Sequence, residues 1–355
     1  MTIINISEPR RPPNSADLAG AFVFITITMN TYILNSPSSI AKTAYQKSPL
    51  TLEEQCNLLK SRGLIIDDID YAISSLKQIG YYRLEAYALV FQEDTQKHIY
   101  RKNTDFKEIV NLYYFDRELR SILLGAIQSI EITLRTSFAY NLSCNYKDAF
   151  AHTKAEYFSN KEIKNKKGLS VHQYDALIDK LKYEYNESDE VFIDHFKNKY
   201  KNVNELPPIW MCTELMTLGE LSKWIQAIKA TKDKKAVADW FNIPLIAFAS
   251  FLKNITVLRN LSAHHARVWN RVFSCNISTS FLEIDFFKNN LHKEEFIDTK
   301  RKNLYNRIVM IEYVLRQLNS PVKFISEIKD LIGRYNIPLE SMGFPANYSE
   351  MQIWN

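Results

Sequence analysis

Apolar side chains recur at intervals of three and four residues along much of the chain. The longest such stretch covers residues 106–142, where the apolar positions that share this spacing are Leu119, Ile122, Leu123, Ala126, Ile127, Ile130, Leu134 and Phe138. This spacing is typical of a helix that buries one face in a core. A similar pattern over residues 299–318 stops at Asn319-Ser320-Pro321, since proline cannot continue a helix. The sequence therefore predicts two long core helices.

Two further helix starts carry a capping box, in which a threonine and a glutamate three residues later bind each other's backbone groups. They are Thr51-x-x-Glu54 and Thr217-x-x-Glu220. Weaker helical patterns cover residues 67–77, 171–185, 191–200 and 210–216. The chain shows no internal repeat, which argues against a helical solenoid. Together these elements predict an all-α fold, a helical bundle.

Two stretches are less regular. The apolar element at residues 84–91 fits a helix or a strand, and its type stays open. Residues 146–168 are polar and lysine-rich, which predicts a mobile connection or a short helix in solvent. We divide the chain into a tail, an N-terminal helical segment, a helical core and a C-terminal extension, at residues 1–46, 47–105, 106–320 and 321–355.

The tail contains an apolar run at residues 19–28, which follows Arg10-Arg11 and resembles the start of a signal peptide. The run is too short to span a bilayer, and no clean cleavage site of small residues follows it. Met29 stands directly after it and is a second candidate for the true start, besides Met1. We therefore expect a cytoplasmic protein with a dispensable tail and no membrane segment, with secretion as the alternative.

Composition narrows the picture further. Eight glycines and eleven prolines in 355 residues favour long helices over a turn-rich β fold. A net charge of +5 permits an anionic partner without demonstrating one. The four cysteines are far apart and form no C-x-x-C pair, so we expect buried free thiols rather than disulfides or a zinc site. No metal or cofactor is expected.

The densest group of chemically capable side chains is Arg259-Asn260-Leu-Ser-Ala-His264, followed by His265-Ala-Arg267-Val-Trp269-Asn-Arg271. We predict that one helix, which starts at Asn242-Ile243-Pro244, carries this stretch and continues to about residue 272. At 100° per residue, Asn260, His264, Arg267 and Arg271 then form one polar stripe, with Arg259 at its edge. The same arithmetic places His265 on the opposite face, where it would pack beside leucine and tryptophan side chains.

This stripe suits the cleavage of RNA by its own 2′-hydroxyl. The reaction needs a proton acceptor and a proton donor, and histidine exchanges protons near neutral pH, so His264 is the candidate acid and base. A guanidinium stays charged and presents a planar fork to phosphate, which suits Arg259. Asn260 can orient the imidazole or bind the ribose. Arg267 and Arg271 can hold flanking phosphates.

A structural interpretation fits the same residues. A polar stripe on an amphipathic helix is usually no more than its solvated face, and an Arg and a His five positions apart are a weak motif by themselves. His265 is more simply a packed, hydrogen-bonded histidine. Trp224 and Trp269 are expected in the core rather than as stacking platforms for bases.

The motif resembles the R-N-x3-H signature of HEPN ribonucleases. The longer string from Leu258 to Arg271 is similar to the Abi-like family of bacterial abortive-infection proteins, the AbiD/AbiF group. Further blocks agree in order over residues 47–320. They are Pro49-Leu-Thr-Leu-Glu-Glu-Gln55, Leu59-Lys-Ser-Arg-Gly-Leu-Ile65, Ile79-Gly-Tyr-Tyr-Arg-Leu84, Tyr114-Phe-Asp-Arg-Glu-Leu119 and Leu206-Pro-Pro-Ile-Trp210.

The resemblance implies a HEPN-like bundle that forms a homodimer, with two motif helices facing each other across a shared cleft. Family members act in phage defence or as toxins restrained by an antitoxin, and some associate with a small noncoding RNA. Many HEPN ribonucleases also carry E-x3-K on an earlier helix. Here Glu131-x3-Arg135 departs from that pattern by an arginine, so a supporting ion pair and an ordinary helix-stabilising pair are both open.

From these observations we predict a metal-independent endoribonuclease that leaves 2′,3′-cyclic phosphate and 5′-hydroxyl ends. Arg259, Asn260 and His264 would carry the chemistry. The main alternative is a non-catalytic protein that holds a partner noncoding RNA through the same basic residues. A protein–protein sensor or antitoxin is a second alternative, and it would show no salt-dependent affinity for nucleic acid.

Overall fold

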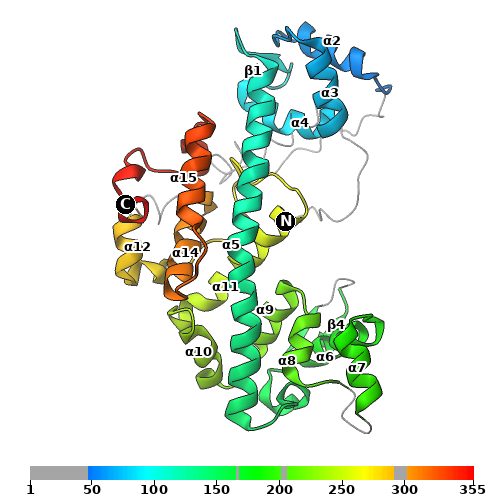
Figure 1. Cartoon of the computed structure of the whole chain (residues 1–355), viewed down its shortest axis with the longest axis vertical. Coiled ribbons are helices and arrows are strands. Elements are labelled where there is room, and N and C mark those ends of the chain that lie inside the picture. Colours follow the sequence, from blue (N-terminus) through cyan, green and yellow to red (C-terminus); the bar gives the residue numbers. More distant parts are fainter. Residues whose placement is uncertain (1–46, 165–167, 201–205, 292–301) are drawn as a thin grey trace. The chain divides into compact units, whose positions relative to one another are not determined.

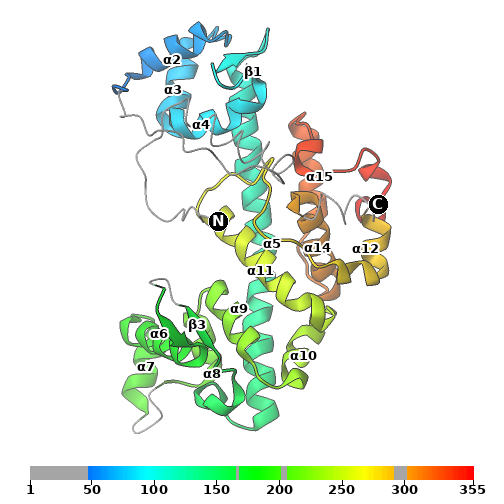
Figure 2. The ribbon, with the colours of Figure 1, turned by 180° about the vertical axis from the view of Figure 1, so that it is seen from behind.

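The computed structural model describes residues 47–164, 168–200, 206–291 and 302–355 (Figures 1 and 2). The predicted tail at 1–46 and the first residues of the predicted helix at 299–318 lie outside the described residues. The predicted all-α class is confirmed, because helices dominate the described chain. Its strands form two short antiparallel hairpins that the sequence analysis did not predict. Within the described residues, no helix is long and apolar enough to cross a membrane.

The described chain divides into two compact units, one ending at Arg117 and the other beginning at Glu118. The first unit is built from helices α2 to α4, a turn of 3-10 helix, a two-stranded hairpin and the first turns of α5. The bounds are α2 Leu52–Ser61, α3 Ile69–Ile79, α4 Tyr81–Ala88, η1 Leu89–Phe91, β1 Gln92–Asp94, β2 Ile99–Tyr100 and α5 Phe106–Tyr146.

Local sequence explains the helix ends of the first unit. The capping box predicted at Thr51 is confirmed: its hydroxyl accepts from the Glu54 amide at 3.2 Å, and its own amide donates to the Glu54 carboxylate at 2.7 Å. Gly80 separates α3 from α4 with φ at +86°, a conformation that glycine adopts without steric cost. The element whose type the sequence left open is therefore the end of α4 followed by η1.

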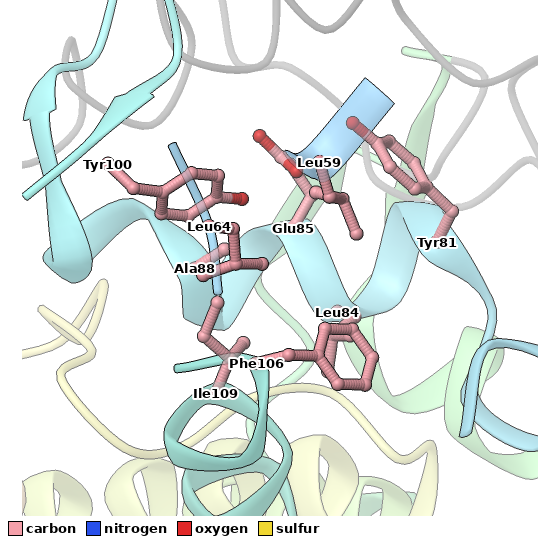
Figure 3. A pocket seen from close by; sticks show the side chains of 9 residues that line it. All are labelled: Leu59, Leu64, Tyr81, Leu84, Glu85, Ala88, Tyr100, Phe106 and Ile109. Carbon is pink, nitrogen blue, oxygen red and sulfur yellow. The ribbon is translucent and has the colours of Figure 1, made fainter. Parts of the chain in front are cut away.

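A polar cluster lies inside the first unit. Glu85 accepts from the Gln92 side-chain amide at 3.2 Å and lies 3.2 Å from Nδ1 of His98, and all three side chains are buried. Figure 3 shows Glu85 beside Tyr81 and Tyr100 at one end of a small cavity, with leucine, phenylalanine and isoleucine side chains around it. Because these polar groups join α4 to the β1–β2 hairpin, the cluster ties the hairpin onto the helices.

The second unit contains the rest of α5 and the later helices. Their bounds are α6 Gln173–Glu187, α7 Val191–Lys199, α8 Ile209–Leu215, α9 Leu218–Ala227, α10 Thr231–Asp239, α11 Leu245–Ala263, α12 Asp285–Asn290, α14 Leu304–Gln317 and α15 Phe324–Arg334. Short 3-10 turns join them at η2 Ala151–Thr153, η3 Ala155–Tyr157, η4 Thr279–Glu283, η6 Glu340–Met342, η7 Tyr348–Glu350 and η8 Gln352–Trp354. A hairpin of β3 Glu162–Lys164 and β4 Ser170–His172 precedes α6.

The long helix α5 supplies much of the core of the second unit, as its spacing predicted. The apolar side chains that it buries completely from residue 123 onward are Leu123, Ala126, Ile127, Ile130, Leu134 and Phe138. The capping box at Thr217 is also confirmed and starts α9. Trp224 on α9 is buried, so the prediction that it belongs to the core holds.

Several elements differ from the prediction. Residues 171–172 belong to β4 instead of the first turn of α6, while α10, α12 and α15 were not predicted. Helix α15 buries Phe324, Ile328 and Leu331. It is tied to α5 at Glu118, whose carboxylate accepts from the Arg334 guanidinium at 2.5 Å and the Tyr335 hydroxyl at 2.6 Å. Part of the predicted C-terminal extension is thus an integral helix of this unit.

Candidate functional site

Arg259, Asn260 and His264, which we call the arginine–histidine motif, lie at the end of a helix that is shorter than predicted. Helix α11 ends at Ala263, nine residues before the expected end, and His264 is its C-terminal cap. The amide of His265 donates to the Ser262 carbonyl at 3.2 Å and that of Ala266 to the Leu261 carbonyl at 2.9 Å. These two bonds form a Schellman motif, in which the residue after the C-terminal cap adopts a left-handed conformation and is usually glycine. Here His265 adopts it, with φ at +57°.

The predicted stripe is therefore wrong beyond His264. Arg267 and Arg271 lie in the irregular segment after the helix, where the Arg271 guanidinium donates to the Arg267 carbonyl at 3.0 Å. Both side chains are partly buried. Val268 and Trp269 are fully buried, so this segment turns its apolar residues into the core without being helical. The prediction that Trp269 belongs to the core is confirmed.

The three motif residues themselves stay together. Arg259 and Asn260 occupy the last turn of α11, and the His264 amide still donates to the Asn260 carbonyl at 3.0 Å, one helical turn earlier. Residues four apart on a helix lie on the same side, so the amide and the imidazole are neighbours at the helix end. Asn260 and His264 are exposed, and the Arg259 side chain is 31% exposed.

The predicted packing of His265 is wrong: its side chain is exposed beside His264. The predicted position of His265 was wrong because this residue has a left-handed backbone conformation, which turns the chain away from the helix axis. A residue with a Cβ is disfavoured in that conformation, although histidine tolerates it better than most. The end of α11 therefore presents two neighbouring imidazoles to solvent instead of one.

A carboxylate on α5 joins the motif arginine to a second arginine. Oε1 of Glu131 accepts from Nη2 of Arg135 at 2.6 Å, and Oε2 of the same carboxylate lies 3.4 Å from Nε of Arg259. The Glu131 side chain is 11% exposed and that of Arg135 is 13% exposed. Water screens such a group far less than a surface pair, so this contact fixes where the Arg259 guanidinium lies.

Arg135 is held in turn by main-chain oxygens. Its Nη1 donates to the carbonyls of Thr213 and Met216, the latter at 2.7 Å, at the junction between α8 and α9. The planar guanidinium can make these bonds while its other nitrogen holds Glu131, which a lysine ammonium cannot do with the same geometry. Arg135, Glu131 and Arg259 thus form a chain of contacts from the α8–α9 junction to the motif.

In this arrangement the Arg259 guanidinium is held on one side by Glu131 and can bind a ligand with its other N–H groups. Its Nε side meets Glu131, and a guanidinium has five N–H donors, so the outer edge can still bind a phosphate. The exposed imidazole of His264 and the amide of Asn260 lie within two helical turns of it. The described end of α11 therefore offers an oriented cation, an amide and an imidazole close together in the chain.

A buried arginine fixes the segment that follows the motif. Nη2 of Arg307 on α14 donates to Oδ1 of Asn254 on α11 and to the Cys275 carbonyl, both at 2.6 Å. Its guanidinium also lies over the Phe273 ring, 4.0 Å from the centroid. The side chain is fully buried, and burial lowers its pKa from the ordinary arginine value. Arg307 thereby links α11, α14 and the segment beyond the motif.

The role of Arg307 was not predicted, although the sequence carries a signal for it. It follows Leu304 by three residues and precedes Ile308 and Ile311 in the apolar pattern of α14. A charged residue inside an apolar stripe indicates either a buried polar contact or a functional group.

A buried cysteine and histidine form the other combination that suggests catalysis. Sγ of Cys212 lies 3.3 Å from Nε2 of His152, and both side chains are fully buried. Burial raises the pKa of the Cys212 thiol well above its usual range and lowers the pKa of His152 to about 4. A nucleophilic pair needs a thiolate and an accessible substrate path. This neutral, enclosed pair is structural.

The same pair makes the stability of the protein sensitive to mild acid. In the unfolded chain His152 takes up a proton near its ordinary pKa of 6.5, whereas in the folded protein its pKa is about 4. Between these values the unfolded state binds more protons, so the free energy of unfolding falls as the pH falls. From pH 7 to pH 5 the contribution of this residue should drop by about 2 kcal/mol.

Denaturant unfolding of the wild type and of His152→Gln at pH 7 and pH 5 measures this contribution. The wild type is expected to lose about 2 kcal/mol more than the variant between the two pH values. Equal losses in the two proteins would show that His152 is protonated as readily in the folded state as in the unfolded state.

Comparison with known proteins adds one finding. A family model described as Abi-like protein matches residues 74–270, which is just over half of the chain and includes the whole arginine–histidine motif. No curated protein and no solved structure matches the chain.

Proposed function

Because the chain belongs to the Abi-like protein family, we propose that it is a metal-independent endoribonuclease with a role in bacterial phage defence. Arg259, Asn260 and His264 are its catalytic residues, and RNA is its substrate. The contact that carries the proposal is the one between Glu131 and Arg259, because it holds a partly exposed guanidinium at the end of α11, where His264 is also exposed.

The proposed reaction needs no group beyond these side chains and the RNA. The imidazole of His264 removes the proton of the 2′-hydroxyl, and the 2′-oxygen attacks the adjacent phosphorus. The bond from phosphorus to the 5′-oxygen breaks, and that oxygen takes up the proton that His264 has removed, so the imidazole returns to its neutral form. The products are a 2′,3′-cyclic phosphate and a 5′-hydroxyl end. Arg259 stabilises the negative charge that builds on the non-bridging oxygens, while Asn260 orients the ribose or the imidazole.

The remaining arginines have supporting tasks in this proposal. Arg267 and Arg271 follow the end of α11 and position the flanking phosphates. Arg135 holds Glu131, and Glu131 holds Arg259, so the α8–α9 junction sets the position of the catalytic guanidinium. In the family context, a small noncoding RNA or a protein antitoxin would restrain the enzyme.

The activity is tested with purified protein and end-labelled single-stranded RNA in the presence of EDTA, after bound nucleic acid has been removed. Fragments that end in a 2′,3′-cyclic phosphate are the expected result. RNA that is bound tightly and stays intact would replace the proposal with the non-catalytic alternative. A protein that neither binds nor cuts RNA would favour a protein partner.

We also propose that the active form is a homodimer that pairs through α5. The exposed positions of this helix at four-residue spacing from residue 124 to residue 140 carry no charge; they are Leu124, Gln128, Ile132, Thr136 and Tyr140. Gln128, Ile132 and Thr136 lie within about 80° of one another around the helix, and their polar–apolar–polar order is symmetric about Ile132. A second copy related by a two-fold axis there meets a matching surface. Ile132 follows Glu131 directly, which places this surface beside the site.

Ile132→Glu should therefore dissociate the protein, because two carboxylates would meet at the two-fold axis without compensating charge. Light scattering is expected to give twice the chain mass for the wild type and the single-chain mass for the variant. Val191→Glu, at an exposed apolar position on α7, is the matched control and should leave the mass unchanged. A monomeric wild type would contradict the proposal.

A further inference from the structure

A group of lysines lies near Tyr146, the C-terminal end of α5. Two chain segments, residues 154–161 and 227–234, run side by side there: the Ser159 amide donates to the Ala227 carbonyl at 2.7 Å, and the Lys229 amide donates to the Tyr157 carbonyl at 2.8 Å. Phe158 and Ile228 pair as an antiparallel bridge at the centre. The lysines that these segments carry are Lys154, Lys161, Lys229, Lys232 and Lys234, which we call the lysine patch.

The charge of the lysine patch is only partly compensated. Four of its lysines are exposed, and Lys234 is partly buried. The nearest buried carboxylate, Asp233, accepts from the Tyr146 hydroxyl at 2.5 Å and the Asn145 amide at 3.1 Å, so it is occupied by neutral donors. Two exposed glutamates, Glu156 and Glu162, stand in or beside the first segment, which leaves a surplus of positive charge.

Two of these lysines lie close enough to affect each other. The pKa of Lys234 is lowered, first by burial and then by the neighbouring charge of Lys161. Holding two like charges together costs free energy unless an anion lies between or beside them. A phosphate would relieve this repulsion and would release counterions when it bound.

The distance between the lysine patch and the motif can be measured along α5. Asp233, at the start of α10, is bonded to Tyr146 at the end of α5, while Arg259 contacts Glu131 on the same helix. Fifteen residues of α-helix rise by about 22 Å. Both views of the ribbon show α10 beginning near the C-terminal end of α5 and α11 crossing α5 at an angle farther along that helix (Figures 1 and 2).

We propose that the lysine patch is a second phosphate-binding surface for the same RNA strand, about 22 Å along α5 from the catalytic residues. This inference rests on the proposed function for the identity of its ligand. At about 3.4 Å per stacked nucleotide, a strand must extend roughly six nucleotides from the cut to reach the lysine patch. The enzyme accordingly binds long single strands in preference to short ones.

The test is the salt dependence of RNA binding, measured by fluorescence anisotropy with a labelled 20-nucleotide oligouridylate. His264→Ala protein is used throughout, so that the RNA stays intact. Adding Lys161→Ala and Lys234→Ala should make the slope of log affinity against log salt shallower by about 1.4, since each phosphate contact on a single strand contributes about 0.7. Lys323→Ala with Lys329→Ala, two exposed lysines near and on α15, is the control with the same charge change.

Strand length provides a second measurement. With the lysine patch intact, affinity should rise steeply between a 4-nucleotide and a 10-nucleotide RNA, and the double variant should reduce that rise. A slope and a length dependence equal to those of the control would overturn the inference, even if the enzyme cuts RNA. Weaker, less salt-dependent binding by the patch variant would support it, even if cleavage by the unsubstituted enzyme is never observed. The two proposals can therefore fail separately.

Discussion

His264→Ala is expected to abolish RNA cleavage while the protein stays folded. The imidazole is exposed at the end of α11, so its removal leaves no cavity and breaks no core contact. Loss of a general acid–base group lowers a rate by about 10²- to 10⁴-fold, and the charge stabilisation by Arg259 cannot replace a proton transfer. Single-turnover cleavage of labelled RNA measures the change, and the melting temperature reports on the fold.

The matched control is His195→Ala, which removes another exposed imidazole, on α7. Cleavage by that variant should equal cleavage by the wild type. Undiminished cutting by His264→Ala would refute the assignment of this residue. Because His265 is exposed beside it, the double variant of both histidines should then be measured, since a neighbouring imidazole can take over part of the proton transfer.

Arg307→Ala is expected to cause the largest loss of stability of any single substitution considered. The variant removes the guanidinium donor from the Cys275 carbonyl and from Oδ1 of Asn254, which keeps only the Cys275 thiol, and it opens a space beside the Phe273 ring. A buried acceptor left without its donor costs about 1–3 kcal/mol, and the space left by a large buried side chain adds to this loss. Denaturant unfolding should show this as a lower midpoint, and cleavage should fall as well, since the segment after the motif loses its anchor.

Two further variants show how much of this loss of stability comes from the burial of Arg307. Arg307→Lys keeps the charge but loses the planar group over the Phe273 ring and the Nη1 bond to the Asn303 carbonyl, so its unfolding midpoint should lie between those of the wild type and Arg307→Ala. Arg334→Ala removes an exposed guanidinium from Glu118 and should change the midpoint little. If Arg334→Ala and Arg307→Ala had equal midpoints, the buried contacts of Arg307 would contribute no more than a surface pair.

The helices that the sequence predicted well are those with a continuous apolar face. Helix α5 keeps the three- and four-residue spacing from Leu119 to Phe138, because one side of it meets the core along that length. Thr51 and Thr217 could be assigned as caps because capping depends on a few neighbouring residues. Such local and periodic signals survive without knowledge of the tertiary structure.

The end of α11, in contrast, was predicted wrongly from its apolar spacing. Its apolar spacing continues through Val268 and Trp269, so the sequence predicts a helix beyond His264. The chain instead turns at His265 and buries the same two side chains from an irregular segment. No glycine or proline marks the turn, and a residue with a Cβ in the left-handed region has no reliable local signature.

The candidate site was predictable in part. Arg259, Asn260 and His264 are brought together as the motif spacing indicated, and Glu131 and Arg135 form the ion pair that their spacing allowed. The contact between Glu131 and Arg259 could not be derived, since these residues are distant in the sequence and no local pattern relates them. Whether the site cleaves RNA stays a prediction.

The bonds that Arg135 makes to the carbonyls of Thr213 and Met216 bear on how this protein can diverge. Every amino acid carries a carbonyl, so point substitutions at those two positions need not disturb the anchor. An insertion or deletion between them would shift both oxygens at once. We therefore expect homologues to vary in the identity of residues at this turn while keeping its length constant.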